Sequence, residues 1–365
     1  MQVKDIIAIM ERLAPLNYQE GYDNCGLQVG DAAAPITGIL LTLDVTEAVV
    51  DEAMRRGCNM IVAHHPLIFG GLKRLTGRNY VERTILKAIK NDIAIYAAHT
   101  NLDNMRHGVN ARIAEKLGLV NTRILAPMGN TLCKLYTYAP ANIADRVRDA
   151  MFAAGAGAVG NYSECSFNTT GTGTFRPGSD ANPAIGTAGG EREQVEEVKI
   201  EVLVEKHAER AVLEAMRRSH VYEEVAYELI PLANANQQIG AGMVGELPQP
   251  MNGTDFLAHV KQAMKTDCIR HTALLIEPVK RVALCGGAGS FLLKDAISAG
   301  AQFFITGDFK YHQFFDAGGK IVIADIGHYE SEQFTTELFA EALGAQLPAA
   351  RILLSETPTN PVFYY

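Results

Sequence analysis

The chain contains 365 residues, of which 48% are hydrophobic and 20% are charged, with a net charge of −8 at pH 7. This length exceeds what one hydrophobic core usually organises, so we expect two or three domains. The acidic balance leaves no broad basic surface, which disfavours nucleic acid as a partner. No stretch is long and apolar enough to span a bilayer, and the six scattered cysteines form no C-x-x-C pair. We therefore expect a soluble cytoplasmic protein with reduced thiols and no membrane partner.

Residues 1–125 are predicted to alternate helices with strands. Residues 1–16 are typical of an amphipathic helix, and charges within its apolar run argue against a signal peptide. Residues 36–69 have the strand, helix, strand pattern of a parallel β-α-β unit. A helix over 80–91 then leads into a buried strand over 93–99. This alternation predicts a parallel sheet with helices on its faces.

Residues 126–240 have a different composition, including a Gly, Ser and Thr-rich stretch at 155–190. The predicted order of elements is β-α-β-β-α-β, which is typical of a ferredoxin-like α+β module. Residues 241–365 return to the α/β pattern with further strands and a final helix over 328–344. We therefore predict a three-layer α/β domain with a mixed or parallel sheet, discontinuous in sequence because it contains an inserted α+β domain.

Three predicted strands of the α/β domain end in possible metal ligands. Because the carboxyl ends of parallel strands line one edge of a sheet, these residues can converge although they are distant in sequence. His328 and Glu332 are four residues apart at a helix start, which puts both on one face. The candidate ligands are His64, His65, His99, Asp103, His328 and Glu332.

Four imidazoles and two carboxylates exceed the needs of one tetrahedral zinc ion, so the set suits two divalent ions. Nitrogen and oxygen ligands without thiolate favour zinc, iron, manganese or cobalt. Adjacent His64 and His65 would face opposite ways on an extended strand, so both can bind only if the chain bends, as Pro66 encourages. A pair of metal ions predicts metal-assisted hydrolysis, with Glu332 or Asp103 orienting the attacking water.

Several motifs, taken in chain order, resemble the NIF-three-like dinuclear-metal family, whose members are called GTP cyclohydrolase I type 2 homologues. The matching segments are YDNCGLQVG from Tyr22, AHHPLIF from Ala63, AAHTNLD from Ala97, GGAGS from Gly286, TGDFKYH from Thr306 and DIGHYESE from Asp325. The resemblance implies that the same six residues are the metal ligands. It also implies a toroidal homohexamer whose metal sites face an internal cavity. The segment 126–240 is similar to the PII-like or CutA-like insert of longer members.

Three further features have an alternative explanation that is purely structural. The loop with Asp23, Asn24 and Gly26 is either a wall of the site or an ordinary turn. The turn Gly286–Ser290 offers backbone amides to a phosphate or serves only the fold, and its spacing does not fit a Rossmann site. His312 is a candidate base or proton shuttle, with surface packing as the alternative.

Two functions remain open from the sequence. The first is a dinuclear-metal hydrolase of a small substrate, with a nucleotide-like molecule as one option and Glu332, Asp103 and His312 as catalytic candidates. The second is a non-catalytic metal-binding scaffold or regulator whose insert senses a ligand or drives assembly. Fold resemblance does not identify a substrate, so the sequence does not name one.

Overall fold

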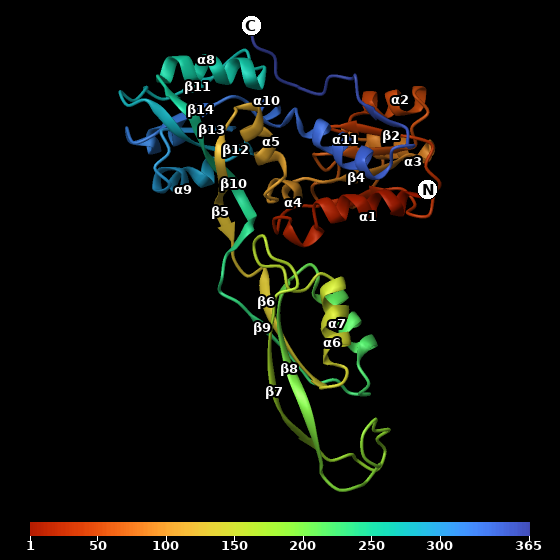
Figure 1. The fold of residues 1–365 in the computed structure, drawn as a ribbon. Helices are drawn as coiled ribbons and strands as arrows, with labels where there is room; N and C mark the ends of the chain where they lie inside the picture. The colour runs from red at the N-terminus through yellow and green to blue at the C-terminus, as the bar shows by residue number, and fades with distance from the viewer. The chain divides into compact units, whose positions relative to one another are not determined.

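The computed structural model describes all of residues 1–365 and divides the chain into two compact units. The α/β unit comprises Met1–Pro127 and Gln237–Tyr365, and the insert comprises Met128–Asn236. Figure 1 shows the path of the chain through both. None of the helices has the length and hydropathy that crossing a bilayer requires.

The first sheet of the α/β unit has five strands in the order β1-β4-β3-β2-β15. Strands β2, β3, β4 and β15 are parallel, and β1 pairs antiparallel with β4. The bounds are β1 Gly26–Val29, β2 Ile39–Thr42, β3 Met60–Ala63, β4 Ala94–Ala97 and β15 Ile352–Leu354. Every residue of β2, β3 and β4 is buried. Such continuous apolar strands are expected where helices cover both faces of a sheet.

Helices cover both faces of this first sheet. Alternate strand residues point to opposite faces, so Leu40 and Ile61 pack with helices α2 (Glu47–Arg55) and α3 (Tyr80–Lys90). Leu41, on the other face, shares a core with α1 (Val3–Leu13) and α11 (Thr335–Gln346).

The second sheet of the α/β unit has six strands in the order β11-β14-β13-β12-β10-β5. Strands β12, β13 and β14 are parallel, while β10 and β11 pair antiparallel with their neighbours. The bounds are β5 Val120–Met128, β10 Asn236–Met251, β11 Arg270–His271, β12 Val279–Ala288, β13 Phe303–Gly307 and β14 Val322–Asp325. Its helices are α5 Val109–Lys116 and α8 Gly253–Met264 in one core, and η2 Ser290–Leu292, α9 Leu293–Ser298 and η3 Tyr311–Ala317 in another.

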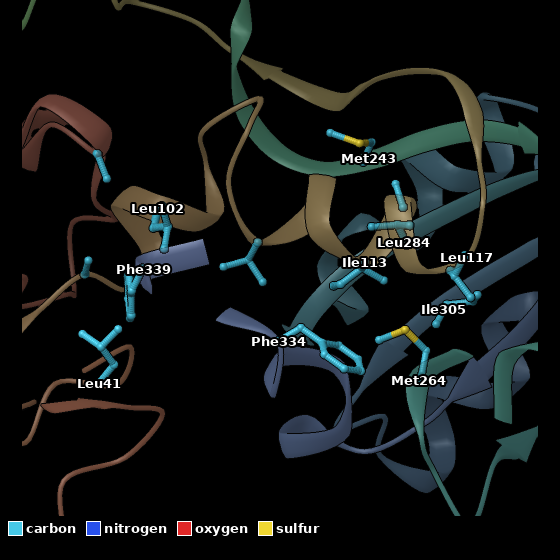
Figure 2. Close-up of a cluster of buried hydrophobic side chains, with 14 of the residues drawn as sticks. Leu41, Leu102, Ile113, Leu117, Met243, Met264, Leu284, Ile305, Phe334 and Phe339 are labelled. Carbon is cyan, nitrogen blue, oxygen red and sulfur yellow. The ribbon is translucent and has the colours of Figure 1, made fainter. Parts of the chain in front are cut away.

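One hydrophobic cluster joins the two sheets. In Figure 2, Leu41 and Phe339 lie toward one end, Met264 and Ile305 toward the other, and Phe334 lies between them. All five side chains are at most 4% exposed. Because this core is continuous, the strand ends of both sheets are held in a fixed relation to each other.

The insert folds around its own core of β-sheet and helix residues. Its elements are β6 Leu132–Pro140, α6 Ala144–Ala153, β7 Ser166–Phe175, β8 Glu193–Glu205, α7 Glu209–Ser219 and β9 Tyr227–Pro231. All pairings in the sheet are antiparallel, in the order β7-β8-β6-β9. The predicted element order is present, and its second strand, β7, lies within the Gly, Ser and Thr-rich stretch.

The mixed α/β class is confirmed, but two details differ from the sequence-based expectation. The α/β unit contains two sheets rather than one, and each takes strands from both halves of the chain: β15 joins the first sheet and β5 joins the second. The predicted helix over 328–344 is divided into α10 (His328–Glu332) and α11. The break lies at Gln333 and Phe334, and Phe334 packs into the hydrophobic core two residues after the polar Glu332.

Candidate metal centre

The six predicted ligands lie together in the α/β unit, and they come from the ends of both sheets. His64 and His65 directly follow β3, and His99 follows β4 by two residues. Asp103 ends the short helix α4 (Thr100–Asp103). His328 and Glu332 begin and end α10, which follows β14 of the second sheet. The convergence predicted for one sheet edge therefore occurs across two sheets.

The two adjacent histidines both reach this cluster. Strand β3 ends at Ala63, and beyond it the amide of His64 donates to Thr42 and that of His65 donates to Leu43. The centroids of the two imidazole rings are 4.9 Å apart. The chain therefore bends at the strand end, as binding by both side chains would require.

Glu332 is the centre of the cluster and its side chain is 2% exposed. Its Oε2 lies 2.9 Å from His65 Nε2 and 3.1 Å from His328 Nε2. Its Oε1 lies 3.7 Å from Nε2 of His64. Three groups have ligand atoms within 4.8 Å of one another: His64, His65 and His99; His65, His328 and Glu332; and His64, Asp103 and Glu332.

Each imidazole is held by its Nδ1 atom, so that Nε2 is directed toward the cluster. Metal-binding histidines are commonly oriented in this way, by a carboxylate or a carbonyl at the other ring nitrogen. The Nδ1 partners are Ala98 O at 2.8 Å for His64, Asp44 at 2.7 Å for His65, Asp23 at 2.9 Å for His99 and Asp308 at 2.7 Å for His328.

Two buried atoms in this cluster have no hydrogen-bond partner, namely His64 Nε2 and Asp103 Oδ1. They lie 3.6 Å apart. Leaving a buried polar group unpaired costs about 1–3 kcal/mol, and more when the group is charged. A cation between the imidazole and the carboxylate would satisfy both atoms. The residues therefore fit a metal site.

The two carboxylates of the cluster are driven apart in pKa. Burial raises the pKa of Asp103 above its usual value, and the charge of Glu332 raises it further. Burial also opposes ionisation of Glu332, but attraction to His64 and the hydrogen bond with His328 hold its pKa well below the usual value. Two carboxylates this close do not readily ionise together unless positive charge compensates them.

In a comparison with known proteins, nearly the whole chain matches the profile of one family. The profile of Duf34/NIF3 (NGG1p interacting factor 3) matches residues 1–361. This chain belongs to the NIF3 family. It is 42% identical over 325 residues to a "GTP cyclohydrolase 1 type 2 homolog" of Halalkalibacterium halodurans, covering 88% of this chain and 87% of that protein. It is 39% identical to the Bacillus subtilis protein of that name, over 98% of this chain and 97% of the relative.

The fold is also found in a solved structure whose sequence identity to this chain is similar to that of the relatives above. The crystal structure of a Bacillus cereus protein related to NIF3 has a TM-score of 0.87 and 39% sequence identity. The match covers 100% of this chain and 99% of that one. The mixed α/β architecture is therefore shared with a solved NIF3-family structure.

The Gly-rich turn of this NIF3-family chain serves the fold. The amides of Gly286, Gly287 and Gly289 donate to Asn110, Ser331 and Thr306, so they are already bonded within the protein. Gly287 has φ +60°, and a Cβ there would lie 2.5 Å from Glu332 Oε1. Only glycine allows the strand end to approach the central carboxylate this closely.

Two other residues that the sequence suggested for the site, Asp23 and His312, differ in their contacts with the ligand cluster. Asp23 touches the site, because it accepts hydrogen bonds from His99 and from the backbone amide of Thr100. His312 is exposed on η3, where its ring contacts Tyr311 and Phe315, and it lines neither cavity beside the cluster. Its exposure and its ring contacts favour the surface-packing alternative for His312.

Sequence reasoning missed Asp44 and Asp308, which orient His65 and His328. Asp44 lies two residues after β2, and Asp308 directly follows β13. The available signal was therefore the same as for the ligands: an acidic residue at the carboxyl end of a predicted parallel strand.

Two cavities border the cluster, and His99 and His328 line both of them. The larger has a volume of about 700 Å³ and is bordered by His65, His99 and His328. Phe69, Tyr329 and Arg270 also line it. The smaller, of about 170 Å³, is bordered by Asp103 and Glu332 among others. Small-molecule sites usually have volumes of about 300–1,000 Å³, so the larger cavity has the size of a substrate site.

Proposed function

We propose that this chain is a dinuclear-metal-dependent hydrolase of a small substrate. The observation that carries the proposal is the convergence of four imidazoles and two carboxylates, with the buried atoms His64 Nε2 and Asp103 Oδ1 unpartnered. The ions would be zinc, iron, manganese or cobalt. The residues that would hold them are His64, His65, His99, Asp103, His328 and Glu332.

When bound, two such ions supply Lewis-acid polarisation of the bond under attack and an acidified water. The protein's part is to fix geometry. Asp23, Asp44 and Asp308 keep three imidazoles in one orientation, which avoids reorganisation during the reaction. Glu332 and Asp103 would orient the water from the buried side of the cluster.

The larger cavity supports a nucleotide-like substrate. Its volume of about 700 Å³ accommodates a molecule of that size, and Phe69 offers an aromatic surface for a flat ring. Arg270 is the cationic side chain in its lining, and it forms an ion pair with Asp325, which also lines the cavity. The names of the relatives, which refer to GTP cyclohydrolase, point to the same substrate class.

The test is hydrolysis by protein reconstituted with each metal, offered GTP, other nucleotides, phosphoesters and cyclic amides. We expect turnover that is lost in Glu332→Gln, which keeps the shape but removes the central charge. Glu337→Gln is the matched control, because Glu337 lies on α11 in an ion pair with Lys116. A fully loaded wild type that is inert toward every substrate would refute the hydrolase proposal.

The alternative is a metal-binding scaffold whose PII-like or CutA-like insert senses a ligand. It is favoured by a cavity of about 400 Å³ within the insert, lined by Tyr138, Phe175, Glu197 and Tyr222 among others. This alternative predicts that ligand binding to the insert changes metal affinity or assembly without turnover. Replacing the insert with a short linker would then abolish function, whereas a hydrolase would retain some activity.

We infer that the chain assembles as a toroidal homohexamer. Support comes from exposed aromatic side chains on and near η3: Tyr311 is 72%, Phe315 68% and Phe291 66% exposed. Exposed apolar groups of this size often mark protein interfaces. Native mass spectrometry would give a hexamer for the wild type and smaller species for Phe315→Asp. A monomeric wild type would refute the inference.

A further inference from the structure

The C-terminal segment 355–365 lies against the candidate metal centre. It follows β15 and contains no helix or strand. Figure 1 shows it leaving the first sheet beside β2 and ending near α8. Asn360, Pro361, Val362 and Tyr364 line the larger cavity beside His65 and His328.

The start of this segment is fixed by Glu52 on α2. The hydroxyls of Ser355 and Thr357 both donate to the Glu52 carboxylate, each at 2.6 Å. The backbone amides of Glu356 and Thr357 donate to it as well. The Glu52 side chain is 2% exposed, so this attachment is buried and well satisfied.

Two residues farther along, Thr359 makes an equivalent contact with a different carboxylate. Its Oγ1 donates to Asp44 Oδ2 at 2.8 Å. The other oxygen of Asp44 accepts from His65 Nδ1 at 2.7 Å. His65 Nε2 in turn lies 2.9 Å from Glu332. A continuous chain of hydrogen bonds therefore connects the C-terminal segment to the central carboxylate.

Asp44 needs such a partner to keep one orientation. It lies in the loop after β2, and its side chain is 32% exposed. A short carboxylate at that exposure can rotate toward water, which would release Nδ1 of His65. The hydroxyl of Thr359 occupies the second oxygen and so favours the rotamer that holds the imidazole.

The segment also contacts the second half of the site. The side-chain amide of Asn360 donates to Glu330 at 3.1 Å, and Glu330 lies on α10 between His328 and Glu332. Thr359 therefore contacts the loop that follows β2 of the first sheet. The next residue, Asn360, contacts α10, the helix that follows β14 of the second sheet.

We propose that Thr359 is a positioning residue of the metal centre, which acts through Asp44 to orient His65. The inference rests on the proposed function, because it requires that His65 binds metal. It is distinct from a purely structural role for the segment, which would depend equally on Thr357 and Thr359.

The experiment compares full-length wild type with Thr359→Val, Thr359→Ser and Thr357→Val. Each protein is loaded with cobalt, and its metal affinity is measured by competition with a chelator while the visible absorption spectrum is recorded. Thr359→Val removes the hydroxyl at nearly constant shape. Removing a partner that orients a ligand typically weakens metal binding 10–100-fold, and for this indirect partner we expect about tenfold with an altered spectrum.

Thr359→Ser should restore both readouts, because it restores the donor. Thr357→Val is the matched control: it loses a hydroxyl contact to Glu52 in the same segment and should bind cobalt as the wild type does. Wild-type affinity in Thr359→Val would overturn this inference and leave the proposed function standing. Equal weakening by Thr357→Val and Thr359→Val would also overturn it, in favour of a structural role. A wild type that binds no metal would overturn both proposals.

Discussion

The α/β unit and the insert use histidine in opposite ways. In the α/β unit, four imidazoles are fixed at Nδ1 and directed at a shared space, where His64 Nε2 has no partner. In the insert, both nitrogens of His220 are bonded, to the Tyr138 carbonyl and the Tyr222 amide. All three groups of potential metal ligands lie in the α/β unit. In the α/β unit the imidazoles therefore converge on one another and leave His64 Nε2 open, whereas in the insert His220 serves the fold.

The largest expected difference between the two units is in their response to metal, which should stabilise the α/β unit and not the insert. At a free metal concentration of 1,000 times Kd, each ion should stabilise the α/β unit by about 4 kcal/mol, because only the folded state holds the ligands together. The insert should be unaffected. Hydrogen exchange by mass spectrometry, with and without chelator, measures the two units separately. Equal protection of both would contradict the assignment of the metal to one unit.

Core truncations should also act on one unit at a time. Phe339→Ala removes a fully buried ring from the α/β core and should cost about 3–5 kcal/mol. Met151→Ala in the insert should cost about 2–5 kcal/mol. Denaturant unfolding followed by hydrogen exchange would locate each loss. A loss of protection in both units from either variant would show that they unfold as one.

Replacing a glycine by alanine should lower the free energy of unfolding in the α/β unit but not in the insert, and by less than the core truncations do. Gly287→Ala places a Cβ against Glu332 at positive φ and should cost about 1–3 kcal/mol and weaken metal binding. Gly171→Ala in β7 of the insert is the control, since its Cβ would meet no atom within 4 Å. We expect its effect on unfolding free energy to stay within about 0.5 kcal/mol. If Gly287→Ala were equally silent, the close approach to Glu332 would not matter.

A further prediction concerns the pH dependence of stability. Burial by itself would raise the pKa of Glu52, but the hydroxyls of Ser355 and Thr357 outweigh it and lower the pKa to about 2 from the usual 4.5. The carboxylate is therefore favoured by folding, and its contribution is present above pH 4.5 and is lost as pH falls toward 2. Between these values, Glu52→Gln should show a weaker decline in unfolding free energy than the wild type. Parallel pH profiles would contradict this.

Much of the site could be predicted because it depends on local sequence. His64, His65 and His99 end strands of continuous apolar residues, and parallel strand ends meet at an edge. The spacing of His328 and Glu332 was enough to place both on one helix face. The α/β class followed from the same alternation of elements.

The remainder depends on contacts between segments that are distant in sequence. The strand-end pattern could have placed Asp44 near the site, but no pattern within the chain indicates that Thr359, 315 residues away, bonds to it. The division of the strands into two sheets also involves distant segments, because β15 pairs with β2 and β5 joins the second sheet. The break between α10 and α11 lies at Gln333 and Phe334, where Phe334 packs into the core shared by both sheets.

The most direct test of the account is metal content by mass spectrometry, on protein purified without chelator. Wild type should carry about two ions per chain, and both Glu332→Ala and the double variant His64→Ala with Asp103→Ala should carry fewer. The reason is that Glu332 belongs to two of the three ligand groups, while His64 and Asp103 supply the unpartnered atoms. A wild type that remains free of metal even after reconstitution would contradict the central claim.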